Sequence, residues 1–149
     1  MAGVSEEKYE CIRLDNQLCF PLYACAKEVV RQYRKPLEEL NLTYTQYVVM
    51  MVLWEHGSMT EGELGRKVYL DSGTLAPLLK RLDNLGYINR IRPGNNERKL
   101  IVSLTRQGEA LREKAVEIPS KLDGCIPLTK EELTQLKELL DKALLLMAK

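Results

Sequence analysis

Cys19 and Tyr23 are two side chains whose types and spacing fit redox chemistry. They lie four residues apart in the segment LDNQLCFPLY, so a helix would place the phenol hydroxyl over the face that carries the thiol. Asp15 or Asn16 is suited to cap that helix, which would put Cys19 in or near its first turn, where the dipole favours a thiolate. A thiolate is the form that a peroxide oxidises to sulfenic acid. The alternative is a structural cysteine buried among aromatic side chains.

A second group of residues fits DNA binding. Residues 69–82 (YLDSGTLAPLLKRL) predict a helix that begins sharply, with Asp71 or Ser72 as its cap and small polar residues on its first turn. Such a helix start approaches a duplex closely, and its backbone N–H groups suit a phosphate. The candidate DNA contacts on this helix are Ser72, Gly73, Thr74, Pro77, Lys80 and Arg81. The alternative is an ordinary capped helix.

A basic hairpin follows this helix directly. We expect strands at 87–92 and 99–104 around the turn Pro-Gly-Asn-Asn at 93–96. Its candidate DNA contacts are Arg90, Arg92 and Arg98, because an arginine on a hairpin tip can enter the narrow minor groove. Asp83 and Glu97 are expected to form local ion pairs. The alternative is a charged hairpin that is only solvated.

Cap and turn signals define the elements that must position these residues, with helix caps expected at Thr43, Thr60 and Thr129. We expect further helices at 15–34, 44–55, 61–68, 105–122 and 131–148, with Pro36 interrupting the first and a short helical turn at 37–40. The helix at 61–68 and the one that begins near Ser72 would form a helix-turn-helix. The residues 44–54 (YTQYVVMMVLW) are apolar nearly all round, so we expect that helix to be buried.

Composition limits the possible classes of protein. A chain of 149 residues with 45% apolar and 29% charged residues fits one globular domain. Its net charge of +1 argues against a generally basic nucleic-acid coat but permits a local basic patch. No apolar run approaches the ~20 residues that span a bilayer, and the N-terminus does not read as a signal peptide. We therefore expect a cytoplasmic protein without membrane association.

The cysteines argue against a metal site. Cys11, Cys19, Cys25 and Cys125 show no C-x-x-C spacing, and His56 is the only histidine. In a reducing compartment these cysteines are thiols, and any disulfide would be regulatory. We expect Cys25 to pack on a different helical face from Cys19, and Cys11 to be incidental. Cys125 lies in a loop, where a thiol is mobile enough to attack a sulfenic acid.

The sequence resembles the MarR family of winged-helix repressors, and specifically its organic-hydroperoxide-sensing (OhrR-type) branch. The resemblance covers roughly residues 13–145 and is carried by LDNQLCFPLY, LTYTQYVVMMVLWE, YLDSGTLAPLLKRLDNLGYINR and ERKLIVSLT. Two positions depart from the branch. Pro21 stands where the branch usually has Ala or Leu, and Asn96 stands where its wing usually has Asp.

The resemblance implies a mainly α fold with a small β-hairpin wing, as a single domain over 1–149 that forms a homodimer. The winged helix-turn-helix core would occupy about 43–105, and the dimerisation helices about 15–36 and 105–148. The implied function is a repressor of a pseudo-palindromic operator in double-stranded DNA, with an organic hydroperoxide as inducer and no cofactor or metal. Oxidation of Cys19 would release the DNA.

The resemblance also assigns individual residues. It adds Tyr33 and Tyr44 to the environment of the sensor Cys19, from the end of the first helix and from the facing helix or the partner subunit. It makes Arg98 the wing arginine, and it pairs Cys125 with Cys19 of the other subunit. One alternative is a MarR-type repressor that responds to a small non-redox ligand. Another is a thiol peroxidase, although the sequence places no arginine beside Cys19.

Overall fold

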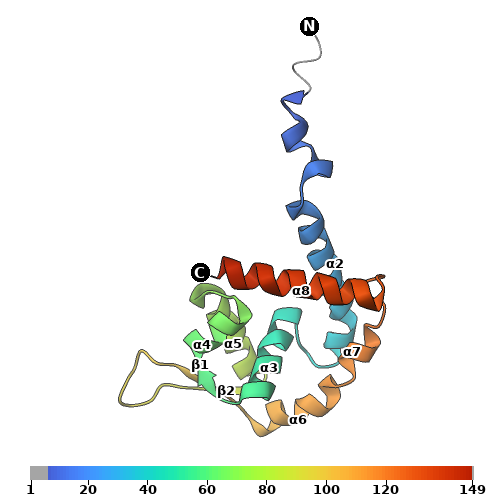
Figure 1. Ribbon diagram of the computed structural model, residues 1–149. Helices are drawn as coiled ribbons and strands as arrows, with labels where there is room; N and C mark the ends of the chain where they lie inside the picture. The colour runs from blue at the N-terminus through green and yellow to red at the C-terminus, as the bar shows by residue number, and fades with distance from the viewer. Residues whose placement is uncertain (1–6, 149) are drawn as a thin grey trace.

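The computed structural model describes residues 7–148 and shows a mainly helical chain with a small antiparallel sheet (Figure 1). The chain begins with two single turns of 3-10 helix, η1 (Glu10–Ile12) and η2 (Leu14–Asn16). The helices that follow are α2 (Cys19–Glu38), α3 (Tyr44–His56), α4 (Glu61–Val68), α5 (Ser72–Asn84), α6 (Arg106–Ala115), α7 (Ile118–Lys121) and α8 (Lys130–Met147). The strands are β1 (Met59–Thr60), β2 (Ile88–Ile91) and β3 (Ile101–Leu104).

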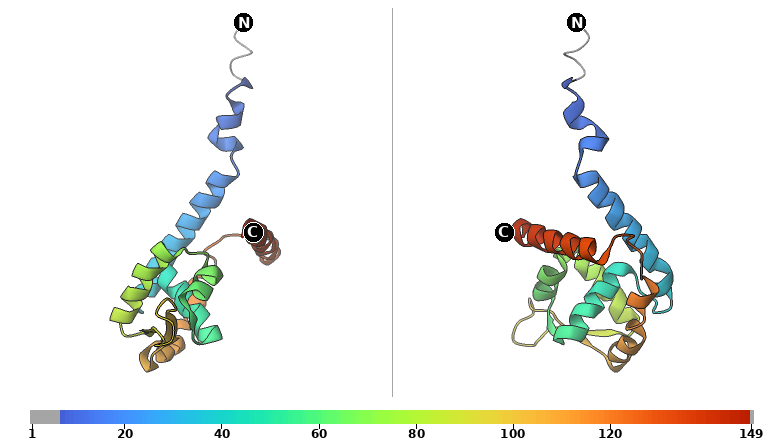
Figure 2. Two further views of the ribbon diagram at one scale, coloured as in Figure 1. Left: turned by 90° about the vertical axis from the view of Figure 1, so that its left-hand side faces the viewer. Right: turned by 45° about the vertical axis from the view of Figure 1, so that its right-hand side comes forward.

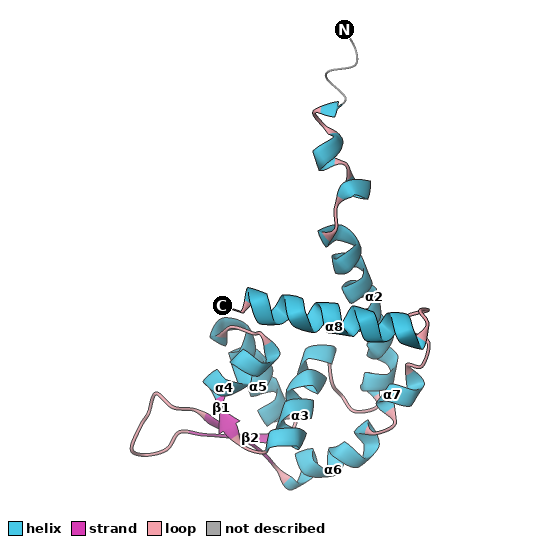
Figure 3. Ribbon diagram, in the orientation of Figure 1, coloured by secondary structure: helices cyan, strands magenta, loops and turns pink. Residues whose placement is uncertain are grey.

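Helices α3, α4 and α5 pack with the sheet into a body that contains the core (Figure 3). Each of these helices contributes fully buried apolar side chains, among them Leu53, Leu64 and Leu79. Helix α3 supplies Tyr47, Val49 and Met50 as well, so the expected burial of this helix is confirmed. The C-terminal end of α2 joins the same core through Leu37.

The caps of the body helices are those that the sequence predicts. Thr43 and Thr60 each form a capping box, with Gln46 and Glu63 respectively, so that side chain and backbone satisfy each other at the helix start. Helix α3 ends at Gly57, whose φ of 73° is a conformation that favours glycine. Because these signals are local, the helices at 44–55 and 61–68 were predicted to within one residue.

The sheet has the strand order β1-β3-β2. In the hairpin, Arg90 lies opposite Val102 and Ile88 lies opposite Leu104. The two expected strands are confirmed, although each is shorter than predicted. Strand β1 was not predicted, because a strand of two residues carries no alternation and forms only by pairing with β3.

The first helix begins later and ends later than the sequence predicted. Neither Asp15 nor Asn16 caps it, because both lie in η2, and the Asn16 side chain instead donates to the carbonyl oxygen of Glu10 at 2.8 Å. Pro21 is the third residue of α2, where the missing N–H has no helical partner to lose. Pro36 was expected to interrupt this helix, but it lies inside the last turn of α2, which continues to Glu38.

The helix expected at 105–122 is broken into α6 and α7. Pro119 has no N–H to donate to the carbonyl of Ala115, and its ring disfavours a continuous helix at this point. Leu111 and Ile118 are nevertheless both buried, so the chain bends while its apolar face follows the core. Thr129 forms the predicted capping box with Glu132 at the start of α8.

The N-terminal half of α2 and the whole of α8 lie outside the body. Figure 2 shows α2 extending away from the body, and it shows α8 standing apart from the body in one view. Leu18 is 83% exposed and Leu145 is 70% exposed. Among the described residues, no helix is both long enough and apolar enough to cross a membrane.

Candidate functional site

The start of α5 presents a row of small, exposed residues. The carboxylate of Asp71 accepts a hydrogen bond from the backbone N–H of Thr74 at 2.8 Å, and this bond lowers the pKa of Asp71. Ser72, Gly73 and Thr74 are exposed on the first turn, as are Pro77, Lys80 and Arg81 farther along. Leu75, Leu79 and Leu82 point the opposite face into the core. The predicted DNA contacts on this helix therefore share its solvent-facing side.

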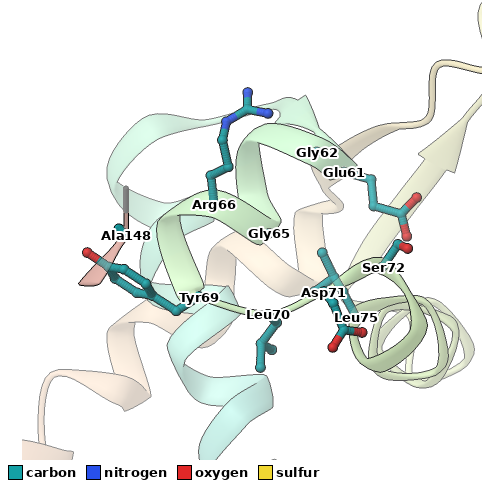
Figure 4. A pocket seen from close by; sticks show the side chains of 10 residues that line it. All are labelled: Glu61, Gly62, Gly65, Arg66, Tyr69, Leu70, Asp71, Ser72, Leu75 and Ala148. Atoms are coloured by element: carbon teal, nitrogen blue, oxygen red, sulfur yellow. The ribbon is translucent and has the colours of Figure 1, made fainter. Parts of the chain in front are cut away.

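A tight turn joins α4 to α5 and fixes the angle between them. Tyr69 takes a left-handed conformation with a φ of 56°, and Leu70 N–H donates to the carbonyl of Gly65 at 3.0 Å. A Cβ on Gly65 would lie 2.8 Å from the carbonyl oxygen of Leu70, so the turn requires glycine there. A cavity of about 610 Å³ opens beside this turn (Figure 4). Its lining includes Arg66 and Ser72, which places it at the start of α5.

Arg90 connects the hairpin to α5. Its Nε lies 3.0 Å from the Asp83 carboxylate, and both side chains are partly buried. The expected ion pair of Asp83 is thus confirmed, and the guanidinium of Arg90 is already occupied within the protein. Arg90 therefore orients the hairpin on the helix.

The tip of the hairpin is exposed and basic. Arg92 Nη1 donates to the backbone oxygen of Glu97 at 2.7 Å, which closes the tip on itself. Glu97 takes part through its backbone, whereas we expected its carboxylate to pair. Asn96 Oδ1 accepts from the backbone N–H of Arg98 at 3.1 Å. The neutral Asn96 therefore shapes the backbone at Arg98, whose side chain is exposed.

Cys19 is the first residue of α2 and is exposed. The sulfur therefore lies at the helix N-terminus, closer to the positive end of the helix dipole than the sequence predicted. Tyr23 lies one turn later, and its ring is beside the Lys27 ammonium at 5.9 Å. Within residues 7–148, the Tyr23 hydroxyl makes no hydrogen bond to the Cys19 sulfur. Cys25 is exposed in the single chain, so it does not pack within its own subunit.

Tyr33 and Tyr44 lie far from Cys19 of the same chain. Tyr33 is 14 residues along α2, which corresponds to ~21 Å of helix. Its ring stacks at 4.8 Å from the ring of Tyr44 and lies 6.0 Å from that of Tyr47. Burial, the neighbouring tyrosines and Cys125 together raise the pKa of Tyr33. Tyr33 and Tyr44 therefore lie together, and in one chain Tyr33 lies near Cys125 and not near Cys19.

Two residues that sequence analysis missed hold Cys125 in place. The side-chain amide of Gln32 donates to the Cys125 backbone oxygen at 3.2 Å, across 93 residues of chain. Lys121, four residues before Cys125, forms an ion pair of 2.7 Å with Glu39 at the end of α2. Both contacts dock the α7 segment on α2. No local sequence signal could have found them, because the partners are far apart in the chain.

Comparison with known proteins identifies the family to which the chain belongs. The model of the SarA/Rot family of transcriptional regulators matches residues 31–116. The chain is 46% identical to the organic hydroperoxide resistance transcriptional regulator of Bacillus subtilis, over 91% of this chain and 92% of that protein. The chain belongs to the MarR family of winged-helix transcriptional regulators. It is a DNA-binding regulator and not an enzyme, and the resemblance to the hydroperoxide branch is confirmed.

Solved structures agree with this assignment. Reduced AbfR bound to DNA has a TM-score of 0.77 and 35% identity, and the match covers 95% of this chain and 99% of that one. The AbfR structure with a disulfide formed has a TM-score of only 0.62 at 36% identity, over 97% of this chain and 99% of that one. The chain is therefore less similar in overall shape to the disulfide form of AbfR than to the DNA-bound form.

Proposed function

We propose that this regulator is a homodimeric repressor that releases its operator when an organic hydroperoxide oxidises Cys19. The observation that carries the proposal is the position of Cys19, an exposed thiol on the first residue of α2, in a chain with a winged helix-turn-helix. A thiol there is open to a peroxide and faces the end of the helix that stabilises anions. The Bacillus subtilis relative supports the inducer class by its name.

DNA binding uses the exposed face of α5 and the hairpin tip. Ser72, Gly73 and Thr74 approach the major groove, and Lys80 and Arg81 hold phosphates. Arg98 enters the minor groove, and Arg92 contacts the adjacent backbone. In a symmetric dimer, two such units read a pseudo-palindromic operator with half-sites about one helical turn apart.

The dimer is built from the terminal helices, around the winged helix-turn-helix core at about 43–105. The N-terminal half of α2 and the C-terminal half of α8 both expose apolar side chains, including Phe20, Leu22 and Leu144. Apolar side chains that lie exposed together in this way are typical of a protein interface. The regions 15–36 and 105–148 therefore form the dimerisation unit of a single domain over 1–149, as the family resemblance implies.

The geometry of one chain argues that the redox bridge joins two subunits. Cys125 docks on α2 at Gln32, 13 residues after Cys19, and this corresponds to ~20 Å along the helix. A disulfide requires Cα atoms within ~7 Å, so the two cysteines of one chain cannot meet while α2 is intact. Cys125 therefore bonds to Cys19 of the partner subunit. Tyr33, which lies near Cys125, and Tyr44, which stacks on Tyr33, then become the environment of that Cys19.

The redox step is a two-electron oxidation by the hydroperoxide. The Cys19 thiolate attacks one peroxide oxygen, forming an S–O bond while the O–O bond breaks and an alcohol leaves. The sulfur of Cys125 then attacks the Cys19 sulfenic sulfur, forming the S–S bond and releasing water. Closure draws two segments together and changes the spacing of the DNA-binding units.

Operator binding before and after one equivalent of cumene hydroperoxide tests the proposal. Wild-type protein should lose affinity and run as a covalent dimer on a non-reducing gel. Cys19→Ser should bind the operator equally well and ignore the peroxide, with Cys25→Ser as the matched control that still responds. A Cys19→Ser protein that is still released by peroxide contradicts the proposal.

A second candidate is a repressor that binds a small organic anion without oxidation. A cavity of about 490 Å³ on α2 is lined by Lys27, Arg31 and Arg34 together with the ring of Tyr44, which suits an aromatic carboxylate. An operator complex that dissociates with such a carboxylate under reducing conditions, and does so in Cys19→Ser as well, would favour this function. In either case the regulator works in the cytoplasm, where DNA is found and where its thiols stay reduced.

A further inference from the structure

The loop that carries Cys125 has one polar anchor to α2. Cys125 follows Gly124, whose φ is 77°, in the connection between α7 and α8. Its backbone N–H donates to Leu122 at 2.9 Å, a bond within the loop, whereas its carbonyl accepts from the Gln32 side chain at 3.2 Å, a bond to the helix. The Gln32 contact is partly buried, so water competes for it less than it would at the surface.

Gln32 lies on a stretch of α2 where the neighbouring charged side chains pair with each other. The Glu28 carboxylate, one turn earlier, accepts two hydrogen bonds from Arg31, with N–O distances of 2.9 and 2.6 Å. The Gln32 amide instead donates to the Cys125 carbonyl at 3.2 Å, across 93 residues of chain. This bond joins α2 to the loop.

We propose that Gln32 is a positioning residue for the resolving thiol: its amide holds the Cys125 carbonyl and so fixes where the Cys125 sulfur meets the sulfenic acid. The inference rests on the proposed Cys19–Cys125 bridge between subunits. Attack by a thiol on a sulfenic sulfur is faster when the two groups are held in place than when one moves freely in a loop. Gln32 acts on this second step, because its hydrogen bond is to the backbone of the resolving residue Cys125 and not to either sulfur.

Substitutions at Gln32 separate positioning from general stabilisation. Gln32→Met keeps the length of the side chain and removes the donor, whereas Gln32→Lys restores a donor of similar reach. Lys35→Met is the matched control, an exposed residue three positions later on α2. Each reduced variant is first compared with wild type in operator affinity and thermal unfolding. Gln32→Glu keeps the length and polarity of the side chain but puts a carboxylate, which cannot donate, opposite the Cys125 carbonyl, so it gives a second measurement if Gln32→Met folds poorly.

The two chemical steps are then timed separately after one equivalent of cumene hydroperoxide. Dimedone trapping reports sulfenic acid at Cys19, and non-reducing gels with peptide mapping report the Cys19–Cys125 bridge. Gln32→Met should form sulfenic acid at the wild-type rate but close the disulfide about fivefold more slowly, the effect of one lost hydrogen bond. Gln32→Lys should recover most of the rate, and Lys35→Met should match wild type.

Two results would overturn the role of Gln32. One is closure in Gln32→Met at the wild-type rate. The other is an equal slowing of both steps, which would indicate a structural effect only. Failure of the underlying bridge is distinguishable, because wild-type protein itself would then show no Cys19–Cys125 peptide.

Discussion

The body of this regulator is complete within one chain, whereas its terminal helices are not. In the body, α3, α4, α5 and the sheet bury a continuous set of leucines, and polar contacts such as Arg90–Asp83 close on partners in the same chain. In the terminal helices, apolar side chains lie exposed: Leu22 is 52% exposed, and α8 has no buried residue. The two regions therefore differ in whether one chain alone covers their apolar side chains.

This difference separates the surface that binds DNA from the site proposed to sense peroxide. The surface that reads DNA is shaped by contacts inside one chain, so a subunit carries a preformed half-site reader. Cys19 lies at the start of α2, whereas Tyr33, which lies near Cys125, is 14 residues farther along. Under the proposed mechanism, the sensing site is therefore assembled from two chains. Mutations in the body should thus act on folding or on DNA affinity, and mutations in the terminal helices should act on assembly and on the redox response.

The largest expected effect is on assembly, from Leu22→Glu. A carboxylate in the apolar dimer face would have to be buried without a partner, so the dimer should dissociate at micromolar concentration. Since Leu22 is exposed in the isolated chain, far-UV circular dichroism should stay unchanged. Analytical ultracentrifugation measures the result. Met51→Glu, at an exposed apolar residue of the body, should remain dimeric; a dimeric Leu22→Glu would remove the terminal helices from the interface.

Gly108→Ala tests the closure of the body. A Cβ at this position would overlap the backbone oxygen of Tyr87, and the Gly108 carbonyl also accepts from Trp54 Nε1 at 2.9 Å. The resulting shift of α6 against β2 should lower the free energy of unfolding by up to about 3 kcal/mol, as for overpacked cores. Urea denaturation measures this loss. Gly94→Ala should be neutral, because its Cβ would meet open space.

Arg98→Ala tests the hairpin tip. Removing one groove contact should weaken operator binding by about 1–3 kcal/mol and leave stability unchanged. Fluorescence anisotropy with a labelled operator, at fixed salt concentration, measures the affinity. Arg13→Ala is the control, because Arg13 pairs with Glu10 on the N-terminal segment. Equal affinities for Arg98→Ala and wild type would show that the hairpin does not enter the groove.

The same division explains what the sequence could and could not predict. Thr43, Thr60 and Thr129 were predicted as helix caps because each acts on a residue three positions away. The start of α2 was placed too early, because Asn16 bonds to Glu10 and so stabilises a 3-10 turn instead of capping a helix. The effect of Pro119 was missed because the apolar spacing continues across the break between α6 and α7.

Within the candidate sites, the residues proposed to contact DNA were easier to predict than those around the proposed redox cysteines. Lys80 and Arg81 follow from the amphipathic pattern of α5, whose apolar side is buried as the pattern requires. The contact of Gln32 with Cys125 joins residues 93 positions apart, and no periodicity records it. That Tyr33 lies beside Cys125 and far from Cys19 also required the folded chain.

The smallest expected effect concerns the cap of the recognition helix. The pKa of Asp71 is lowered from its ordinary value of 3.8, chiefly by the hydrogen bond from the backbone N–H of Thr74. A carboxyl with a lowered pKa in the folded state contributes stability that is fully present above pH 3.8 and is lost as the pH falls through the folded value. Asp71→Asn keeps a capping oxygen but cannot titrate.

Thermal midpoints of wild type and Asp71→Asn should therefore be similar at neutral pH and differ in acid. Below pH 3.8 the wild-type midpoint should fall further than that of Asp71→Asn. Glu63 also has a lowered pKa, through its bond to Thr60, but it titrates in both proteins and cancels in the difference. Parallel pH profiles would mean that the charge of the Asp71 carboxylate does not stabilise the folded protein. The start of α5 would then depend on the packing of Leu75 and Leu79 alone.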